Sequence, residues 1–357
     1  MWILPVKAIA IVEPNVLLYG QGGTLVIQSL DKPGFKSTLR IFDRQDIHGI
    51  ASCDGPIPCR ILVHGGRFWS LIRLSFSENS YDVTVVASFG CPDWIICGTF
   101  LQSQNQVCLL LGHNSVSAFS LPTSPRISAD FRFQKELVKC VENCILYCGC
   151  LVGGSWEHLL AIGGTAFGSI LFWQPAKGSQ LLSVLTGHNG PITSVFLNPI
   201  SGQLCSGSED RTVRLWKPSL EITSSPLDIG SSTVLKSYTL DRILYGHSSR
   251  VWRLVPLHDE RPVVASVGED SFICYWNVET GRLLDRINCQ RGSIRCSTYH
   301  ARNQTMYCGS DGGAVFSVKT EQFQAFEILE MNLATDEKCT MIANLASNAL
   351  VAVTDLK

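Results

Sequence analysis

Two stretches of the sequence repeat one pattern. The first, GHNGPITSVFLNPISGQLCSGSEDRTVRLWKP, runs from Gly187 to Pro218, and the second, GHSSRVWRLVPLHDERPVVASVGEDSFICYWNV, runs from Gly246 to Val278. Each begins with Gly-His and ends on an alternating run, TVRLW or FICYW, which is typical of a half-buried β-strand. Because short strands and tight turns recur in one order, the repeat predicts an all-β fold made of similar units.

The repeated pattern resembles the WD repeat, whose unit is a four-stranded blade of a β-propeller. In that family a His, a Ser, an Asp and a Trp form a structural tetrad within the unit. The resemblance carries these roles to His188, Ser206, Asp210 and Trp216, and to His247, Ser266, Asp270 and Trp276. The aspartate of such a blade is largely dry, so neighbouring donors must satisfy its carboxylate.

A catalytic Ser-His-Asp triad would use three of the same residue types. The set occurs in two successive units, whereas a catalytic constellation is needed once, and the sequence has no G-x-S-x-G motif. The repetition therefore favours an architectural role over catalysis.

Weaker copies of the unit can be followed along the rest of the chain. Third-strand endings are expected near Leu30, Leu74, Leu121, Trp173, Trp216, Trp276 and Val318, at steps of about 40 to 60 residues. Seven endings predict a seven-bladed WD-repeat β-propeller over residues 1–320. Residues 321–357 would add an outer strand, QAFEIL, and the incomplete start of a further blade or a truncated continuation.

Two positions depart from the WD pattern. Phe167 stands where the unit ending at Trp173 should have its aspartate. The pair Gly112-His113 is too close to the following strand to open a blade, so we expect it in a turn inside one. A blade can lose its polar set and still pack, because stacked repeats share a core.

Composition limits the partners and the compartment. The 357 residues carry a formal net charge of -1, so the molecule as a whole has no electrostatic attraction for DNA or for an anionic membrane. The opening MWILPVKAIAIVEP lacks the basic start and unbroken apolar core of a signal peptide, and no apolar run is long enough to span a bilayer. We expect a cytoplasmic protein without a membrane partner.

The 15 cysteines are scattered over segments with the pattern of buried strands, which indicates free thiols in a reducing compartment. Cys140, Cys144, Cys148 and Cys150 could be drawn as a zinc site, but their spacing does not match paired C-x2-C knuckles. Alternation in ILYCGCLVGG instead puts Cys148 and Cys150 on one face of a strand. No metal site is predicted.

Glycine-rich elements such as YGQGGTLV at Tyr19 could be taken for nucleotide loops. A phosphate loop needs a helix N-terminus after it, and here a strand pattern follows. These elements are interpreted as strand-to-strand turns, and the sequence predicts no cofactor site and no catalytic residue.

Several segments lie outside the generic WD pattern and carry a narrower resemblance. They are IHGI at Ile47, DWIICGTF at Asp93, LLLGHNSV at Leu109, GSWEHLLAIGGTAFGSILFWQPA at Gly154, SEDRTVRLWK at Ser208 and GHSSRVWRL at Gly246. Together, from about residue 8 to Lys319, they resemble the N-terminal propeller of the WD repeat-containing protein 6 family.

That resemblance implies a non-catalytic scaffold for an FtsJ-type methyltransferase, which modifies the ribose 2′-OH of the tRNA anticodon wobble nucleotide. The scaffold would position tRNA, the enzyme or both, so its expected partners are the FtsJ-type tRNA 2′-O-methyltransferase and tRNA. S-adenosylmethionine would be bound by the partner only. Members of that family are much longer than this chain, so contacts made by their other parts could be absent here.

Two other classes of function stay open at this point. One is a generic protein-protein interaction scaffold in trafficking or signalling that binds no RNA. The other is an enzyme with a site in the central channel, which would need acidic or histidine side chains converging from inner strands, and none stands out in the sequence.

The turns that follow Gly-His and the turns that hold the aspartate should emerge together on the narrower face of a WD propeller. They offer Arg250, Trp252 and Arg295, with Glu209 and Glu269 beside the two aspartates. Arginine and tryptophan are enriched in interface hot spots, and arginine pairs with phosphate in a bidentate manner. We interpret these five residues as a candidate face for a partner or RNA; the alternative is a solvated Arg250 and a partly buried Trp252.

Overall fold

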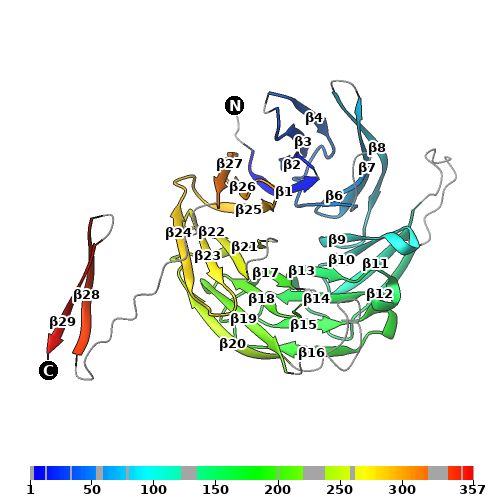
Figure 1. Cartoon of the computed structure of the whole chain (residues 1–357). Coiled ribbons are helices and arrows are strands. Elements are labelled where there is room, and N and C mark those ends of the chain that lie inside the picture. Colours follow the sequence, from blue (N-terminus) through cyan, green and yellow to red (C-terminus); the bar gives the residue numbers. More distant parts are fainter. Residues whose placement is uncertain are drawn as a thin grey trace. The chain divides into compact units, whose positions relative to one another are not determined.

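A computed structural model describes residues 4–12, 14–32, 34–53, 59–77, 80–121, 135–198, 201–219, 238–257, 262–320, 337–346 and 349–356. The chain divides into two compact units, Met1–Gln322 and Phe323–Lys357. The first unit contains seven antiparallel sheets, which follow one another in chain order (Figure 1). We number these sheets as blades 1 to 7.

Each blade is a meander whose strands run in sequence order from the inner to the outer edge. Blade 1 contains β1 (Val6–Val12), β2 (Val16–Gln21), β3 (Thr24–Ser29) and β4 (Lys36–Arg40). Blade 2 contains β5 (Gly49–Ser52), β6 (Cys59–Gly65), β7 (Phe68–Ser77) and β8 (Ser80–Gly90). Blade 3 contains β9 (Ile95–Leu101), β10 (Gln106–Leu111), β11 (Ser115–Ser120) and β12 (Lys135–Lys139).

The next blades repeat this order. Blade 4 contains β13 (Leu146–Val152), β14 (Leu160–Thr165), β15 (Ile170–Trp173) and β16 (Leu181–Leu185). Blade 5 contains β17 (Ile192–Leu197), β18 (Leu204–Ser208), β19 (Thr212–Pro218) and β20 (Tyr238–Tyr245). Blade 6 contains β21 (Val251–Pro256), β22 (Val263–Gly268), β23 (Phe272–Asn277) and β24 (Leu283–Asn288). Among the described residues blade 7 has three strands, β25 (Ile294–His300), β26 (Thr305–Ser310) and β27 (Val315–Lys319).

The seven inner strands close into a ring. Neighbouring inner strands contact one another from β1 through β5, β9, β13, β17 and β21 to β25, and β25 also contacts β1. All seven predicted endings fall in, or directly after, the third strand of a blade. The prediction of an all-β, seven-bladed propeller is therefore confirmed.

The second unit is described by β28 (Glu337–Ala346) and β29 (Ala349–Leu356), which pair as an antiparallel hairpin. The strand expected at QAFEIL lies outside the described residues. Whether the hairpin begins a further blade stays a prediction.

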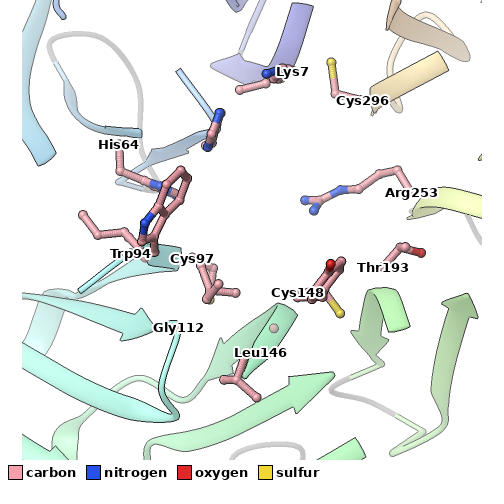
Figure 2. Close-up of a pocket in the computed structure, with 18 of the residues that line it drawn as sticks. Lys7, His64, Trp94, Cys97, Gly112, Leu146, Cys148, Thr193, Arg253 and Cys296 are labelled. Atoms are coloured by element: carbon pink, nitrogen blue, oxygen red, sulfur yellow. The ribbon is translucent and has the colours of Figure 1, made fainter. Parts of the chain in front are cut away.

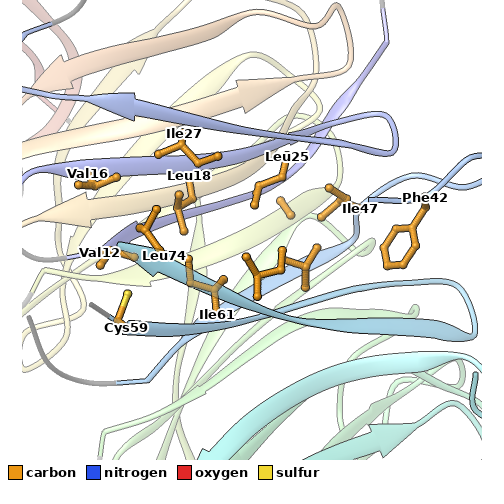
Figure 3. Close-up of a cluster of buried hydrophobic side chains, with 13 residues drawn as sticks. Val12, Val16, Leu18, Leu25, Ile27, Phe42, Ile47, Cys59, Ile61 and Leu74 are labelled. Carbon is orange, nitrogen blue, oxygen red and sulfur yellow. The ribbon is translucent and has the colours of Figure 1, made fainter. Parts of the chain in front are cut away.

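The hydrophobic core is divided into layers between neighbouring blades. Figure 3 shows the layer between blades 1 and 2, where Leu18 and Ile27 face Ile61 and Leu74. Similar clusters join blades 2 and 3, 3 and 4, 4 and 5, 5 and 6, and 7 and 1. Because both faces of a blade are covered, its central strands are apolar on both sides, as in β10, where five of six residues are buried.

Helical structure in the described part of the chain is limited to three 3-10 helices, η1 (Gln102–Gln104), η2 (Trp156–His158) and η3 (Pro175–Lys177). Within the same residues, no helix has the length and apolar character needed to cross a bilayer.

Candidate functional site

The structure brings the first predicted tetrad together in blade 5. Nδ1 of His188 lies 2.7 Å from Oδ2 of Asp210, and Nε2 of the same ring lies 2.8 Å from the Ser206 hydroxyl. The Trp216 indole donates to that hydroxyl at 2.9 Å. His188 comes from the turn that precedes β17, whereas Ser206 and Trp216 lie on β18 and β19, so one network ties the blade's entry turn to its two central strands.

The second tetrad has the same geometry in blade 6. Nδ1 of His247 lies 3.0 Å from Oδ1 of Asp270, and Nε2 lies 2.8 Å from the Ser266 hydroxyl. The Trp276 indole donates to that hydroxyl at 2.8 Å. The Trp216 and Trp276 rings belong to the apolar layers between blades 4 and 5 and between blades 5 and 6, so each ring also packs against the neighbouring blade.

The aspartates of both tetrads are held as carboxylates. Burial alone would raise the pKa of Asp210, but hydrogen bonds from His188 and Thr212 outweigh burial and hold this pKa well below its usual range. The same balance, with hydrogen bonds from His247 and two backbone amides, lowers the pKa of Asp270 to about 2. Burial lowers the pKa of His188 despite the opposing effect of Asp210, which favours a neutral imidazole that donates from Nδ1.

These networks do not have the form of a nucleophilic site. Ser206 and Ser266 are fully buried, and each hydroxyl already accepts an indole N–H while it bonds a histidine. A substrate carbonyl could reach neither oxygen without displacing a tryptophan from the layer between two blades. The geometry supports the structural reading of both sets.

An arginine stands beside each tetrad aspartate, which sequence reasoning missed. Nη2 of Arg214 lies 3.9 Å from Oδ2 of Asp210, and Nη2 of Arg286 lies 4.0 Å from Oδ2 of Asp270. The Arg286 guanidinium also lies 3.6 Å above the Phe272 ring. Arg286 lies on β24, the outer strand of blade 6, so its charge supports the tetrad of its own blade.

In blade 4 the tryptophan indole N–H has a different hydrogen-bond acceptor. Phe167 occupies the expected aspartate position and is largely exposed, while the Trp173 indole donates 3.0 Å to Oδ1 of Asn114. Asn114 lies in the turn between β10 and β11 of blade 3, directly after Gly112-His113. That turn was predicted to lie inside a blade, and its polar residue bridges two blades.

The five residues of the candidate face meet on one surface. The Arg250 guanidinium lies between Glu209 and Glu269, with Nε 3.6 and 3.7 Å from their carboxylates. Cζ of Arg295 lies 3.8 Å above the Trp252 ring, and Cζ of Arg250 lies 6.0 Å from the same ring. Trp252 is half-buried, and Arg295 also bonds Asp311 at 2.6 Å. Arg250 is exposed and Trp252 is half-buried, so a partner can reach both side chains, while the ion pairs and ring contacts hold them in place.

Next to this surface, a cavity of about 640 Å³ lies at the end of the ring where the inner strands begin. Its position follows from a repeated β-bulge. In blades 1, 3, 4, 5, 6 and 7 the register shifts by one residue near the start of the inner strand. A bulge re-aims the extra side chain, and the extra residues that line the cavity are Lys7, Ile96, Tyr147, Thr193, Trp252 and Arg295.

Histidines and one carboxylate also line this cavity, although the sequence showed no convergence of such groups. Oδ2 of Asp93 accepts from the His113 amide at 2.7 Å and lies 2.9 Å from Nδ1 of that residue. His48 precedes β5, and its ring stacks on Trp94 with centroids 6.1 Å apart. These residues come from different blades, so only closure of the ring could reveal their proximity.

His64 is the most buried of the cavity histidines. Burial lowers its pKa to about 3, and the charges of His48 and Arg253 act in the same direction. Its Nδ1 has no hydrogen-bond partner among the described residues. A methyl group added at Gly49 would collide with Nε2 of His64, so the backbone of the inner strand passes directly beside this ring.

The described cysteines are free thiols. No group of three or more His, Cys, Asp or Glu residues within the described ranges could hold a metal ion. Burial raises the pKa of Cys150 to about 12, with smaller opposing effects from a Leu197 backbone hydrogen bond and the charge of Arg253.

Comparison with known proteins agrees with this architecture. Residues 179–217 and 238–277 match the family described as WD domain, G-beta repeat, and these segments contain the two tetrads. The Schizosaccharomyces pombe protein named Protein hir1 is 31% identical over 131 residues, which cover 36% of this chain and 14% of that protein.

Similarity to a second group covers far more of the chain. The human protein named tRNA (34-2'-O)-methyltransferase regulator WDR6 is 26% identical over 332 residues, which cover 88% of this chain and 27% of the human protein. The Drosophila melanogaster protein of the same name is 30% identical over 291 residues, covering 77% of this chain and 28% of that protein. This chain thus spans little more than a quarter of the length of these relatives. It is a WD-repeat β-propeller protein, homologous over most of its length to the WDR6 proteins.

Proposed function

We propose that this chain is a non-catalytic regulator of a tRNA methyltransferase that modifies the ribose 2′-OH of the wobble nucleotide, and that the enzyme is of the FtsJ type. The observation that carries the proposal is the extent of the similarity to WDR6 proteins. It reaches 88% of the chain, whereas the WD-family match is confined to residues 179–217 and 238–277. A generic interaction scaffold would share the tetrad-bearing blades but not the other blades.

In this proposal the chain holds the tRNA, the enzyme or both, so that the ribose hydroxyl lies in line with the methyl donor. A ribose hydroxyl reacts only when it is held in line with the methyl donor, and holding two reactants in that geometry can contribute several orders of magnitude to a rate. The face around Arg250, Trp252 and Arg295 supports such a role, since guanidinium groups and an aromatic ring suit a phosphate-bearing or protein partner. S-adenosylmethionine would be bound by the enzyme, and both proteins would act in the cytoplasm.

Reconstitution tests this proposal. An FtsJ-type enzyme would be incubated with unmodified tRNA and radiolabelled S-adenosylmethionine, with and without the chain, and methylation mapped by nuclease digestion. We expect the chain to increase 2′-O-methylation at the wobble nucleotide and to co-purify with the enzyme. Unchanged methylation together with no association with enzyme or tRNA would refute the proposal, and capture of other proteins without tRNA would favour a scaffold in another process.

Calorimetric titration of the isolated chain with S-adenosylmethionine tests whether the enzyme, rather than this chain, binds the methyl donor. We expect no saturable heat of binding, because the donor belongs to the partner. Saturable one-to-one binding would contradict a non-catalytic subunit.

A further inference from the structure

The residue that directly follows the bulged residue occupies an equivalent position in each inner strand, and Gly49 is its equivalent in blade 2. In six blades this residue is small: Ala8, Gly49, Cys97, Cys148, Ser194 and Cys296. In blade 6 the equivalent residue is Arg253. Arg253 and five of these small residues, all but Ser194, line the cavity, and Arg253 alone among them has a long cationic side chain.

Figure 2 shows Arg253 extending from β21 into this cavity, across from His64 and Trp94. The Cys97, Cys148 and Cys296 thiols of blades 3, 4 and 7 line the same cavity. Burial raises the pKa of each thiol, and the charge of Arg253 opposes the rise.

The other charged groups of the cavity are already balanced. Lys7 pairs with Asp46 at 2.8 Å, and Arg295 bonds Asp311 at 2.6 Å. Asp93, the one carboxylate of the lining, is held by His113. Among the described residues Arg253 has no hydrogen-bond or ion-pair partner, so its guanidinium donors are available to a ligand.

We propose that this cavity binds a phosphate group and that Arg253 holds it. A guanidinium offers a rigid fork of N–H donors that matches two phosphate oxygens, and Arg253 is exposed, so a ligand can reach this fork. Because Lys7 and Arg295 have their own carboxylate partners, the guanidinium of Arg253 is the unpaired cation among the described lining residues, and its charge attracts a dianionic phosphate monoester more strongly than a singly charged carboxylate. About 640 Å³ is also enough room for a nucleotide-sized ligand.

The phosphate could come from a nucleotide of RNA or from a free small phosphate compound, and Trp94 distinguishes the two. Its ring is 53% exposed and lies at the cavity beside His48. An exposed aromatic face can stack a base, whereas it adds nothing to the binding of inorganic phosphate.

The test is titration of the whole chain with inorganic phosphate, adenosine 5′-monophosphate, a short single-stranded RNA and acetate, at one stated low salt concentration. Tryptophan fluorescence and calorimetry would report binding. We expect the phosphate compounds to bind and acetate to bind at least tenfold more weakly. Arg253→Gln should lower phosphate affinity by roughly ten- to a hundredfold, as expected for loss of a charged hydrogen-bond donor.

Arg73→Gln is the matched control, because Arg73 is exposed on β7 and does not line the cavity. Arg253→Lys keeps the charge without the fork and should give an intermediate affinity. Trp94→Ala should weaken the nucleotide and the RNA but not inorganic phosphate if the source is RNA, and should leave all phosphate ligands unchanged if it is a free compound. Equal phosphate affinity in wild type and Arg253→Gln, equal binding of acetate, or no binding of any phosphate compound would overturn the proposal. Methyltransferase stimulation is a separate readout, so either proposal can fail alone.

Discussion

Replacing Asp270 with alanine should destabilise the propeller by about 1 to 3 kcal/mol, the usual cost of leaving a buried polar group without its hydrogen-bond partner. The carboxylate is only 4% exposed and accepts from Nδ1 of His247 at 3.0 Å, from the Ser248 amide at 2.8 Å and from the Phe272 amide at 3.2 Å. Ser248 is exposed, so its amide can bond water instead. The buried His247 cannot, and its lost bond sets the magnitude.

Urea denaturation followed by tryptophan fluorescence measures this change, with the slope of the transition checked for each variant. Asp43→Ala is the matched control, because Asp43 is exposed. Asp270→Asn should lose less than Asp270→Ala, since an amide oxygen can still accept from His247. Asp210→Ala should match Asp270→Ala, because the tetrad geometry of blade 5 is the same.

The tetrad reasoning would be refuted if Asp210→Ala and Asp270→Ala both unfolded at the urea concentration of Asp43→Ala. That outcome would mean that the apolar layers between blades set the stability alone. A loss confined to one variant would instead limit the role of the network to that blade.

Three further predictions concern pH, thiols and the candidate face. The pKa of His64 is lowered in the folded state, first by burial, so below about pH 6.5 the unfolded chain binds a proton that the folded chain does not bind. The free energy of unfolding should therefore fall by up to about 1.4 kcal/mol per pH unit towards pH 3 and stay level above pH 7. Urea midpoints that change with pH in the same way in the wild type and in His64→Phe would contradict this prediction. Burial raises the pKa of Cys205 to about 12, so the thiol should react with a disulfide reagent at pH 8 only after unfolding, and rapid labelling of the folded chain at Cys205, located by mass spectrometry, would be the opposing result. The double variant Arg250→Ala, Arg295→Ala should weaken partner or tRNA association at a fixed salt concentration while the melting temperature stays within a few degrees, because exposed ion pairs contribute about 0 to 1 kcal/mol; wild-type association in pull-down and filter binding would place the contact elsewhere.

The architecture could be predicted from the sequence, because the signals that specify it are local. Strand alternation and turn residues repeat within each unit, so the third-strand endings could be located even where the tryptophan is missing, as at Leu30 and Val318. The two tetrads could be named for the same reason: the spacing from His188 to Trp216 recurs closely between His247 and Trp276, and a repeat places equal spacings in equal positions.

The residues at the centre of the ring could be identified only from the folded structure. Arg253 looks like any alternating strand residue, and the six small residues at its equivalent positions are separated from one another by whole blades. A β-bulge leaves no mark in the residue pattern, so the register that aims Lys7, Trp252 and Arg295 at the cavity could not be inferred. In the same way, the Asn114 bond to Trp173 joins neighbouring blades. Such contacts depend on closure of the ring, which brings distant strand ends together regardless of their separation in the chain.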